Sequence, residues 1–155
     1  MADELVKLLN NNVIINKERI NWDQYFMSIS ILASVRSSCN RLNVGCVLVK
    51  NKRVISMGYN GFLPNTNHNS IIINNHEQAT VHAEQNAISD AANRGISVNE
   101  SIAYITHFPC VNCFKILVAS GIKVIKYLND YKNDNVIDQM IEDGANINIT
   151  KINIT

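Results

Sequence analysis

The chain has 155 residues, which is long enough for one domain with a hydrophobic core and short for two. Hydrophobic residues make up 46% of it and charged residues 17%, as in a folded globular protein. The formal net charge of +1 gives no excess of one sign, so we expect no nucleic-acid partner and expect an anionic ligand to be held by a few local cations.

The N-terminus and the cysteines bear on where the protein works. Asp3 and Glu4 stand where a signal peptide would need a basic start and an apolar run. The densest apolar stretches, such as 47–49 and 71–73, are too short to span a bilayer. We therefore expect no membrane association and a cytoplasmic protein, in the host cytoplasm if the source is viral. In that reducing compartment the four cysteines are expected to be thiols or metal ligands.

The first half of the chain predicts a helix followed by a hairpin. Asn21 is a plausible N-cap, and apolar residues from Trp22 onward recur at helical spacing until near Ser37, with Trp22 expected in the core. Residues 44–49 and 54–59 are expected to be strands joined by a short polar turn. Residues 60–80 are Asn-rich, and we expect an irregular loop there.

The second half predicts strands that alternate with helices. Helices are expected to begin near His82 and end at Gly95, to cover 110–120, and to cover 136–141. Strands are expected at 102–106 and 122–128, with a final strand or two around the isoleucines after 146. Alternation of this kind favours parallel pairing in an α/β fold, with helices on both faces of a mixed sheet.

Two short motifs carry the chemistry of this sequence. They are His82–Ala83–Glu84 and, later in the chain, Pro109–Cys110–Val111–Asn112–Cys113. Together they have the form H-x-E…P-C-x-x-C, which is identified as the signature of zinc-dependent nucleobase deaminases. Each motif alone is weakly specific, whereas the pair in this order is strongly specific.

The three expected metal ligands are His82, Cys110 and Cys113. The two cysteines are three residues apart, so both sulfurs lie on one face of a first helical turn and can bind one ion. The positive end of the helix dipole favours the ligating thiolate. Three protein ligands leave one position open, which is typical of a catalytic zinc site, and we expect one Zn²⁺ per chain.

Glu84 is the expected catalytic residue. It lies beside His82 near a helix start, where its carboxylate can reach the open side of the metal without binding it. From there it can take a proton from the attacking water and deliver it to a ring nitrogen and then to the departing amine. The predicted reaction is the hydrolytic removal of an exocyclic amino group as ammonia.

Other interpretations of the cysteines stay open. Cys110 and Cys113 could be a thioredoxin-type redox pair, although that fold needs a later cis-proline and no proline follows Cys113. All four cysteines could hold a structural zinc in a non-enzymatic binding module. Against this, Cys39 and Cys46 are seven residues apart, and Cys46 within a strand is expected to be a small buried side chain.

The sequence resembles the deoxycytidylate (dCMP) deaminases of the cytidine deaminase-like superfamily over most of 22–132, which we take as the core of one domain spanning 1–155. The stretches that carry the resemblance are 36–49, 58–61, 82–88, 103–106, 109–113 and 121–131. The metal motif is shared by the superfamily, whereas the first two stretches favour dCMP. A histidine as first ligand argues against the free-nucleoside cytidine deaminases.

The resemblance implies a three-layer α/β/α fold with a five-stranded mixed sheet, and an enzyme that converts dCMP into dUMP, a precursor of dTTP. It implies that Asn60 contacts the deoxyribose, that the Ala83 backbone helps hold the pyrimidine and that Tyr131 reaches the phosphate. It also implies a homo-oligomer, with a hexamer favoured. Effector binding of dCTP and dTTP would involve the segment Gly58, Tyr59, Asn60 and Gly61.

Phosphate recognition departs from the family pattern. Some phage members place an arginine where this chain has Asn93, so a dCTP or dual dCMP/dCTP deaminase remains an alternative, as do tRNA adenosine and other nucleobase deaminases. Arg36 and Arg41 are candidate phosphate ligands, of which we select Arg36. His68 and His76 lie where some phage members bind a second zinc, but they do not complete a ligand set, and we expect one metal.

Overall fold

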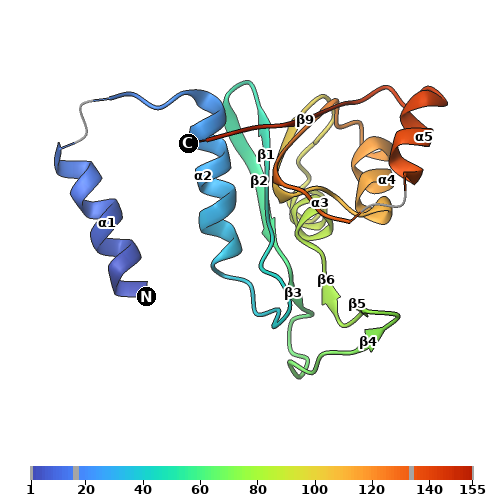
Figure 1. The fold of residues 1–155 in the computed structure, drawn as a ribbon, viewed down its shortest axis with the longest axis horizontal. Helices are drawn as coiled ribbons and strands as arrows, with labels where there is room; N and C mark the ends of the chain where they lie inside the picture. Colours follow the sequence, from blue (N-terminus) through green and yellow to red (C-terminus); the bar gives the residue numbers. More distant parts are fainter. Residues whose placement is uncertain (1, 16–17, 133–134, 155) are drawn as a thin grey trace.

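The computed structural model describes residues 2–15, 18–132 and 135–154. Figure 1 shows a mixed sheet between helices, and a first helix that stands apart from them. The helices are α1 (Ala2–Ile15), α2 (Trp22–Ser34), α3 (Ala83–Asn93), α4 (Val111–Ala119) and α5 (Val136–Glu142). The strands of the main sheet are β1 (Gly45–Lys50), β2 (Arg53–Tyr59), β7 (Ile102–His107), β8 (Val124–Asn129) and β9 (Asn148–Lys151).

The main sheet has five strands in the order β2-β1-β7-β8-β9. Strand β1 pairs antiparallel with both β2 and β7, while β7, β8 and β9 run parallel, so the expected mixed sheet with parallel pairing in the second half is confirmed. The hairpin between β1 and β2 turns at Asn51 and Lys52, whose φ angles are both positive, as a two-residue hairpin turn of this type requires.

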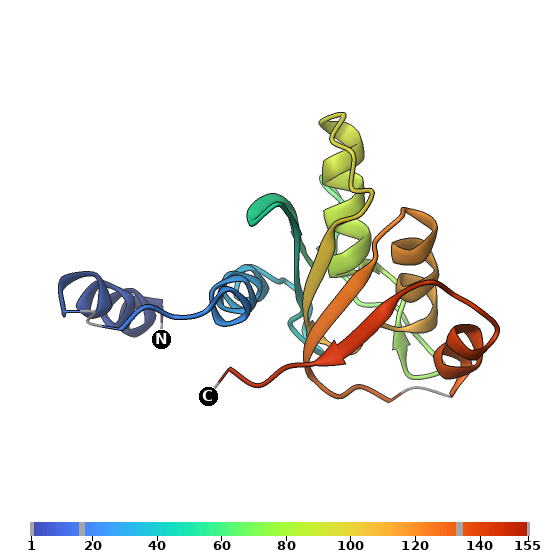
Figure 2. The same cartoon turned by 90° about the horizontal axis from the view of Figure 1, so that it is seen from above.

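Alternate residues of β1 pack on opposite faces of the sheet. Val47 and Val49 lie in the cluster with Phe26 and Met27 of α2, whereas Cys46 and Leu48 lie in the larger cluster with α3, α4 and α5. Seen from above, α2 covers one face and the other three helices cover the opposite face (Figure 2). These are the three layers of the expected α/β/α fold, and they explain why β1 is buried on both faces.

Two glycines let helices approach the sheet closely. A Cβ on Gly45 would lie 1.9 Å from the Ser30 carbonyl oxygen of α2. A Cβ on Gly58 would lie 2.3 Å from the Ala83 carbonyl oxygen of α3. Gly58 therefore seats the start of α3, and the His82 motif with it, against β2.

The helix boundaries follow from local signals. Asn21 caps α2 as expected, since its side chain accepts a hydrogen bond from the Gln24 amide at 2.9 Å and its own amide donates to the Gln24 side chain at 2.9 Å. The helix ends at Ser34, slightly before the expected Ser37. None of the helices in the described part of the chain is both long and apolar enough to cross a membrane.

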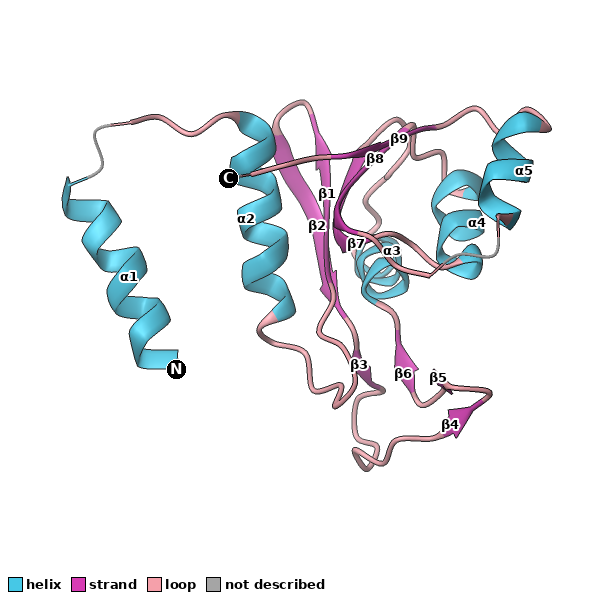
Figure 3. Ribbon diagram, in the orientation of Figure 1, coloured by secondary structure: helices cyan, strands magenta, loops and turns pink. Residues whose placement is uncertain are grey.

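The structure corrects three local expectations. Residues 60–80 are not wholly irregular (Figure 3): they contain the short strands β3 (Gly61–Phe62), β4 (Ile72–Ile73), β5 (His76–Glu77) and β6 (Thr80–Val81). Helix α1 had no predicted counterpart. Trp22, expected in the core, is 42% exposed because it stacks on the outer side of Phe26 at the first turn of α2.

Candidate zinc centre and active-site cavity

Both chemical motifs lie at helix N-termini that follow short strand ends. His82 is the N-cap of α3 and Cys110 is the N-cap of α4. Each motif residue also makes the first hydrogen bond of its helix, with Asn86 N to His82 O at 2.9 Å and Phe114 N to Cys110 O at 2.8 Å. The ligands are therefore fixed by the start of each helix and by the strand before it.

The three predicted ligands converge. His82 Nδ1 lies 3.6 Å from Cys110 Sγ and 3.4 Å from Cys113 Sγ, and the three donor atoms all lie within 4.8 Å of one another. A tetrahedral zinc with Zn–S of about 2.3 Å and Zn–N of about 2.1 Å would place nitrogen and sulfur about 3.6 Å apart. One imidazole and two sulfurs at these distances fit Zn²⁺.

The pKa values of the two cysteines also favour the binding of a cation. Hydrogen bonds from Cys113 and then from His82 lower the pKa of the Cys110 thiol to about 4. The bond to Cys110, together with burial, raises the pKa of Cys113, so by themselves the two thiols hold one negative charge. A divalent cation would supply the charge that allows both sulfurs to ionise.

Glu84 is the second residue of α3 and is 4% exposed. Burial raises the pKa of its carboxyl. Among the described residues the donor group consists of the histidine and the two cysteines, and Glu84 stands outside it, next to all three. The arrangement thus provides three metal ligands and one buried carboxylate that can exchange a proton.

His82, Glu84 and Cys110 line a cavity of about 550 Å³, a volume suited to a small ligand, while Cys113 is fully buried next to them. Its floor is formed by the starts of α3 and α4. Its opposite wall comes from the 39–44 connection, the 76–80 segment and residues 131–132 after β8. His107 at the end of β7 also lines it.

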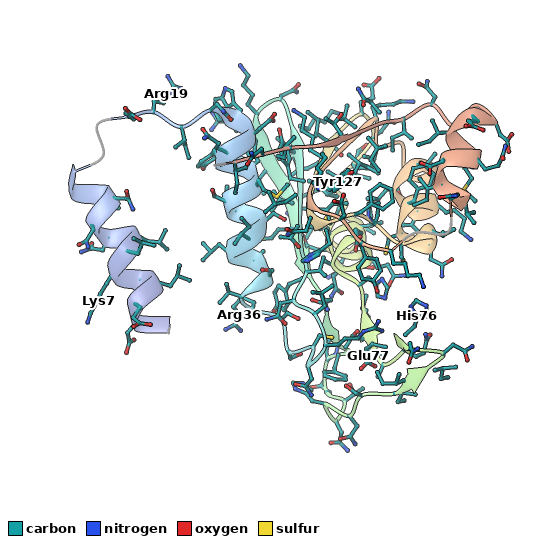
Figure 4. All side chains as sticks on the ribbon, in the orientation of Figure 1. Lys7, Arg19, Arg36, His76, Glu77 and Tyr127 are labelled. Carbon is teal, nitrogen blue, oxygen red and sulfur yellow. The ribbon has the colours of Figure 1, made fainter. Side chains whose placement is uncertain are left out.

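Most of the predicted substrate-binding residues lie on this cavity, and one does not. Asn60 and Tyr131 line the wall, and Ala83 lies at the start of α3 in the floor. Arg36 is exposed in the turn after α2 and does not line the cavity, as its position at the end of that helix in Figure 4 illustrates. Arg41, the other candidate, does line it.

Asn60 also holds the cavity wall together. Its Oδ1 accepts hydrogen bonds from the Val44 amide at 2.8 Å and the Ser37 hydroxyl at 2.7 Å, and its Nδ2 donates to the Leu42 carbonyl at 2.7 Å. The side chain therefore anchors the connection that carries Arg41. Among the described residues, Nδ2 of Asn60 donates only to Leu42, so its second amide hydrogen is available to a ligand.

His76, considered above only for a second zinc, lines the wall from β5, below the sheet in Figure 4. Two further wall residues, Glu77 on β5 and Lys132 after Tyr131, had no signal in the sequence. Glu77 Oε1 accepts from the amides of Ile71 at 3.1 Å and Ala79 at 2.8 Å, while its buried Oε2 accepts no hydrogen bond from any described residue. The Asn-rich composition of this segment gives no periodicity from which these positions could be found.

The remaining predicted residues lie away from the cavity. Asn93 ends α3, and Arg94 beside it pairs with Asp90 and donates to the Ile55 carbonyl at 2.7 Å. His68 stacks on Phe62 with ring centroids 4.9 Å apart. Cys46 is fully buried in the core, as expected, and all four cysteines are free.

A His–Cys–Cys donor set on two helix N-termini, with a buried glutamate beside it in a three-layer α/β/α fold, defines the class of zinc-dependent hydrolases that act on amino groups. The sequence matches the family described as "Cytidine and deoxycytidylate deaminase zinc-binding region" over residues 20–129. The chain belongs to the cytidine and deoxycytidylate deaminase family.

Relatives and solved structures agree with this assignment. ComE operon protein 2 of Bacillus subtilis (strain 168) is 39% identical over 132 residues, covering 83% of this chain and 70% of that protein. Deoxycytidylate deaminase of Schizosaccharomyces pombe is 37% identical, but the chain spans only 41% of its length. The dCMP deaminase of cyanophage S-TIM5, solved with dCMP and dUMP, superimposes with a TM-score of 0.74 at 29% identity, covering 83% of this chain and 95% of that one.

Proposed function

We propose that this protein is a zinc-dependent dCMP deaminase, which adds water at C4 of the cytosine ring and releases ammonia to give dUMP. The observation that carries the proposal is the convergence of His82, Cys110 and Cys113 around one point beside buried Glu84, at the floor of a cavity of about 550 Å³. Removal of an amino group from a cytosine nucleotide needs this set of groups and no further cofactor.

Zn²⁺ held by these ligands would act as a Lewis acid that makes water a nucleophile near neutral pH. The chain's own residues supply the rest. Glu84 accepts the proton of the attacking water and passes it to the ring nitrogen next to C4, and later to the departing amine. Its burial keeps bulk water away from this carboxylate, so protons move between it and the substrate.

Other residues that line the cavity support assignments for the rest of the nucleotide. Asn60 would give its remaining amide hydrogen to the deoxyribose, and the Ala83 backbone would hold the pyrimidine over the floor. Tyr131 would donate to the phosphate. A phosphate also needs a cation, and Arg41 on the cavity wall takes this role in our proposal in place of Arg36.

A dCTP or dual dCMP/dCTP deaminase is the alternative, and one observation favours it. The wall carries Lys132 as well as Arg41, so more than one phosphate could find a cationic partner. Comparison of the two nucleotides as substrates separates the two proposals.

We also propose the wider setting of this activity. One zinc would bind per chain, in a single domain of residues 1–155 with its core at 22–132. The protein would work in the cytoplasm, or the host cytoplasm if viral, as a homo-oligomer for which a hexamer is favoured. Effectors dCTP and dTTP would bind near Gly58, Tyr59, Asn60 and Gly61, although Gly58 itself is explained by helix packing.

The test is a substrate panel on the purified full-length chain, with zinc per chain measured alongside. Ammonia release and the ultraviolet change are followed with dCMP, dCTP, deoxycytidine and a tRNA anticodon stem. We expect dCMP to be the best substrate. Glu84→Gln should keep the metal and lower kcat by about 10²–10⁴-fold, because it removes the proton carrier. Persistent turnover in that variant would exclude Glu84 from the mechanism.

A further inference from the structure

Helix α1 has a broad apolar surface that is largely exposed in the described part of the chain. Val6, Leu8, Leu9 and Val13 are 64%, 60%, 45% and 82% exposed. At 100° per residue these positions and Leu5 cover an arc of roughly 160°, wider than the stripe of about 100° that one neighbouring surface requires. Asn12 is the polar residue within the arc, and its side chain is already bonded to the Leu8 carbonyl at 2.9 Å. An isolated helix of this length is marginal in water, so its apolar arc needs a partner.

Helix α2 shows the same feature on its outer side. No charged residue occurs between Asp23 and Arg36, although one side of this helix faces solvent. Tyr25, Leu32 and Val35 on that side are 45%, 47% and 55% exposed. Ser28 is the exposed polar residue among them, so this side of α2 is uncharged and mostly apolar, whereas the solvent side of a surface helix normally carries charged and polar residues.

The two apolar surfaces lie on the same side of the molecule. In Figures 1 and 2, α1 lies beside the outer side of α2, away from the sheet, and the two helices run in opposite directions. The first turn of α1 carries Asp3 and Glu4, and in Figure 4 Arg36 lies at the end of α2 that is level with this turn. Antiparallel contact would bring these opposite charges together.

The exposed area of the chain also indicates a partner. The accessible surface is 9962 Å² for a mass of 17.4 kDa. A compact monomer of this mass exposes roughly 7,900 Å², so about 2,000 Å² is in excess. A stable dimer buries about 800 Å² per subunit, which this excess more than covers.

We infer that α1 and the outer face of α2 form an interface with a second copy of this chain, in which each α1 packs on the α2 of the other copy. The wide arc of α1 would then contact both the partner's α2 and the partner's α1, giving a cluster of four helices around a two-fold axis. Helix α1 lies outside the family match at 20–129, whereas α2 lies within it. The inference goes beyond the proposed deamination and would stand for another substrate.

The first experiment measures the mass of full-length variants by sedimentation over a wide concentration range. Val13→Asp places a charge in the arc of α1, and Leu32→Asp places one on the outer face of α2. Each should weaken assembly through this interface by about a hundred-fold or more, because an unpaired charge would be buried. Asn11→Asp makes the same kind of change about 160° around α1 from Val13, outside the arc, and should leave assembly within about two-fold. Zinc per chain confirms that each variant is folded.

The second experiment tests whether α1 packs on the α2 of a second copy or on the α2 of its own chain. Val13→Cys and Tyr25→Cys are made in separate chains, mixed and oxidised, with the unmodified chain as control. A covalent dimer that forms only in the mixture supports the exchange, since antiparallel packing brings these positions together. The inference is overturned by a monomeric wild-type chain, by unchanged mass in both Asp variants, or by a chain carrying both cysteines that cross-links only within itself.

Discussion

The two sides of the active-site cavity are built in different ways. The floor consists of residues at the caps and first turns of α3, which follows β6 directly, and α4, which follows β7 after a short connection. The opposite wall consists of connections and short strands, held by side chains such as Asn60 and Glu77 that bond to backbone groups. The floor is positioned by the packed core, whereas the wall is positioned by a few polar contacts.

This difference separates chemistry from selectivity. A change in the floor should remove metal binding or proton transfer altogether, because each group has one task. A change in the wall should alter affinity and the choice among nucleotides, because in our proposal several groups share the binding of the sugar and phosphate. Variants on the two sides can therefore test the division directly.

The largest effect is expected for Cys113→Ser. Loss of a ligand should lower zinc affinity by more than about a hundred-fold, exceeding the usual effect of changing a residue that only orients a ligand, and should abolish turnover. Metal analysis after dialysis against a chelator and an activity assay measure this. Cys46→Ala, which removes a buried thiol from the core, is the control and should retain zinc. If Cys113→Ser kept a full equivalent of tightly held zinc, the ligand assignment would be wrong.

An intermediate effect is expected on the wall at Arg41. Arg41→Gln should raise KM for dCMP by about ten-fold, because a charge-assisted hydrogen bond to phosphate contributes about 1.5–3 kcal/mol. The KM for deoxycytidine, which has no phosphate, should not change. Arg36→Gln is the matched control, since Arg36 lies off the cavity, and should stay within about two-fold. If Arg36→Gln raised KM for dCMP and Arg41→Gln did not, Arg36 would be the phosphate ligand instead.

Glu77→Ala should have a smaller effect on catalysis. The change removes the acceptor for the Ile71 and Ala79 amides, which costs about 1–3 kcal/mol in local stability. We expect faster proteolysis within 60–80 and a modest rise in KM, with kcat little changed. Glu77→Gln keeps an acceptor oxygen and should be intermediate. A large fall in kcat would instead place Glu77 in the chemistry.

The smallest effect is expected far from the cavity, at Asp23. Burial alone would raise the pKa of this carboxyl, but hydrogen bonds from Lys126 and Tyr104 outweigh it and the pKa is lowered. The stabilisation is therefore present above the unfolded pKa of about 3.9 and is lost as the pH falls through the lower folded value. Asp23 is 38% exposed, so solvent screening keeps it to about 1 kcal/mol or less. Urea unfolding should show Asp23→Asn less stable at pH 7 and equal to the wild type well below pH 3; a gap that persisted there would contradict this.

The same division decides what could be predicted from the sequence. The positions of His82, Cys110 and Cys113 follow from local rules, because helix N-termini after strands place ligand side chains in known directions. The wall depends on contacts between distant segments: nothing near Arg41 in the sequence indicates that Asn60 would hold its connection against the cavity while Arg36 stayed outside. The exposure of Trp22 and the presence of α1 were not predicted for a related reason. Helical periodicity does not reveal whether an apolar side faces the chain's own core or solvent.

The position of the ligands at helix caps has a consequence for folding dynamics. His82 and Cys110 supply the acceptors for the first hydrogen bonds of α3 and α4, at 2.9 and 2.8 Å. An ion that fixed both residues would tether the fraying ends of two helices at once. Amide hydrogen exchange at Asn86 and Phe114 should then slow together on metal loading, which would report occupancy of the centre without any substrate.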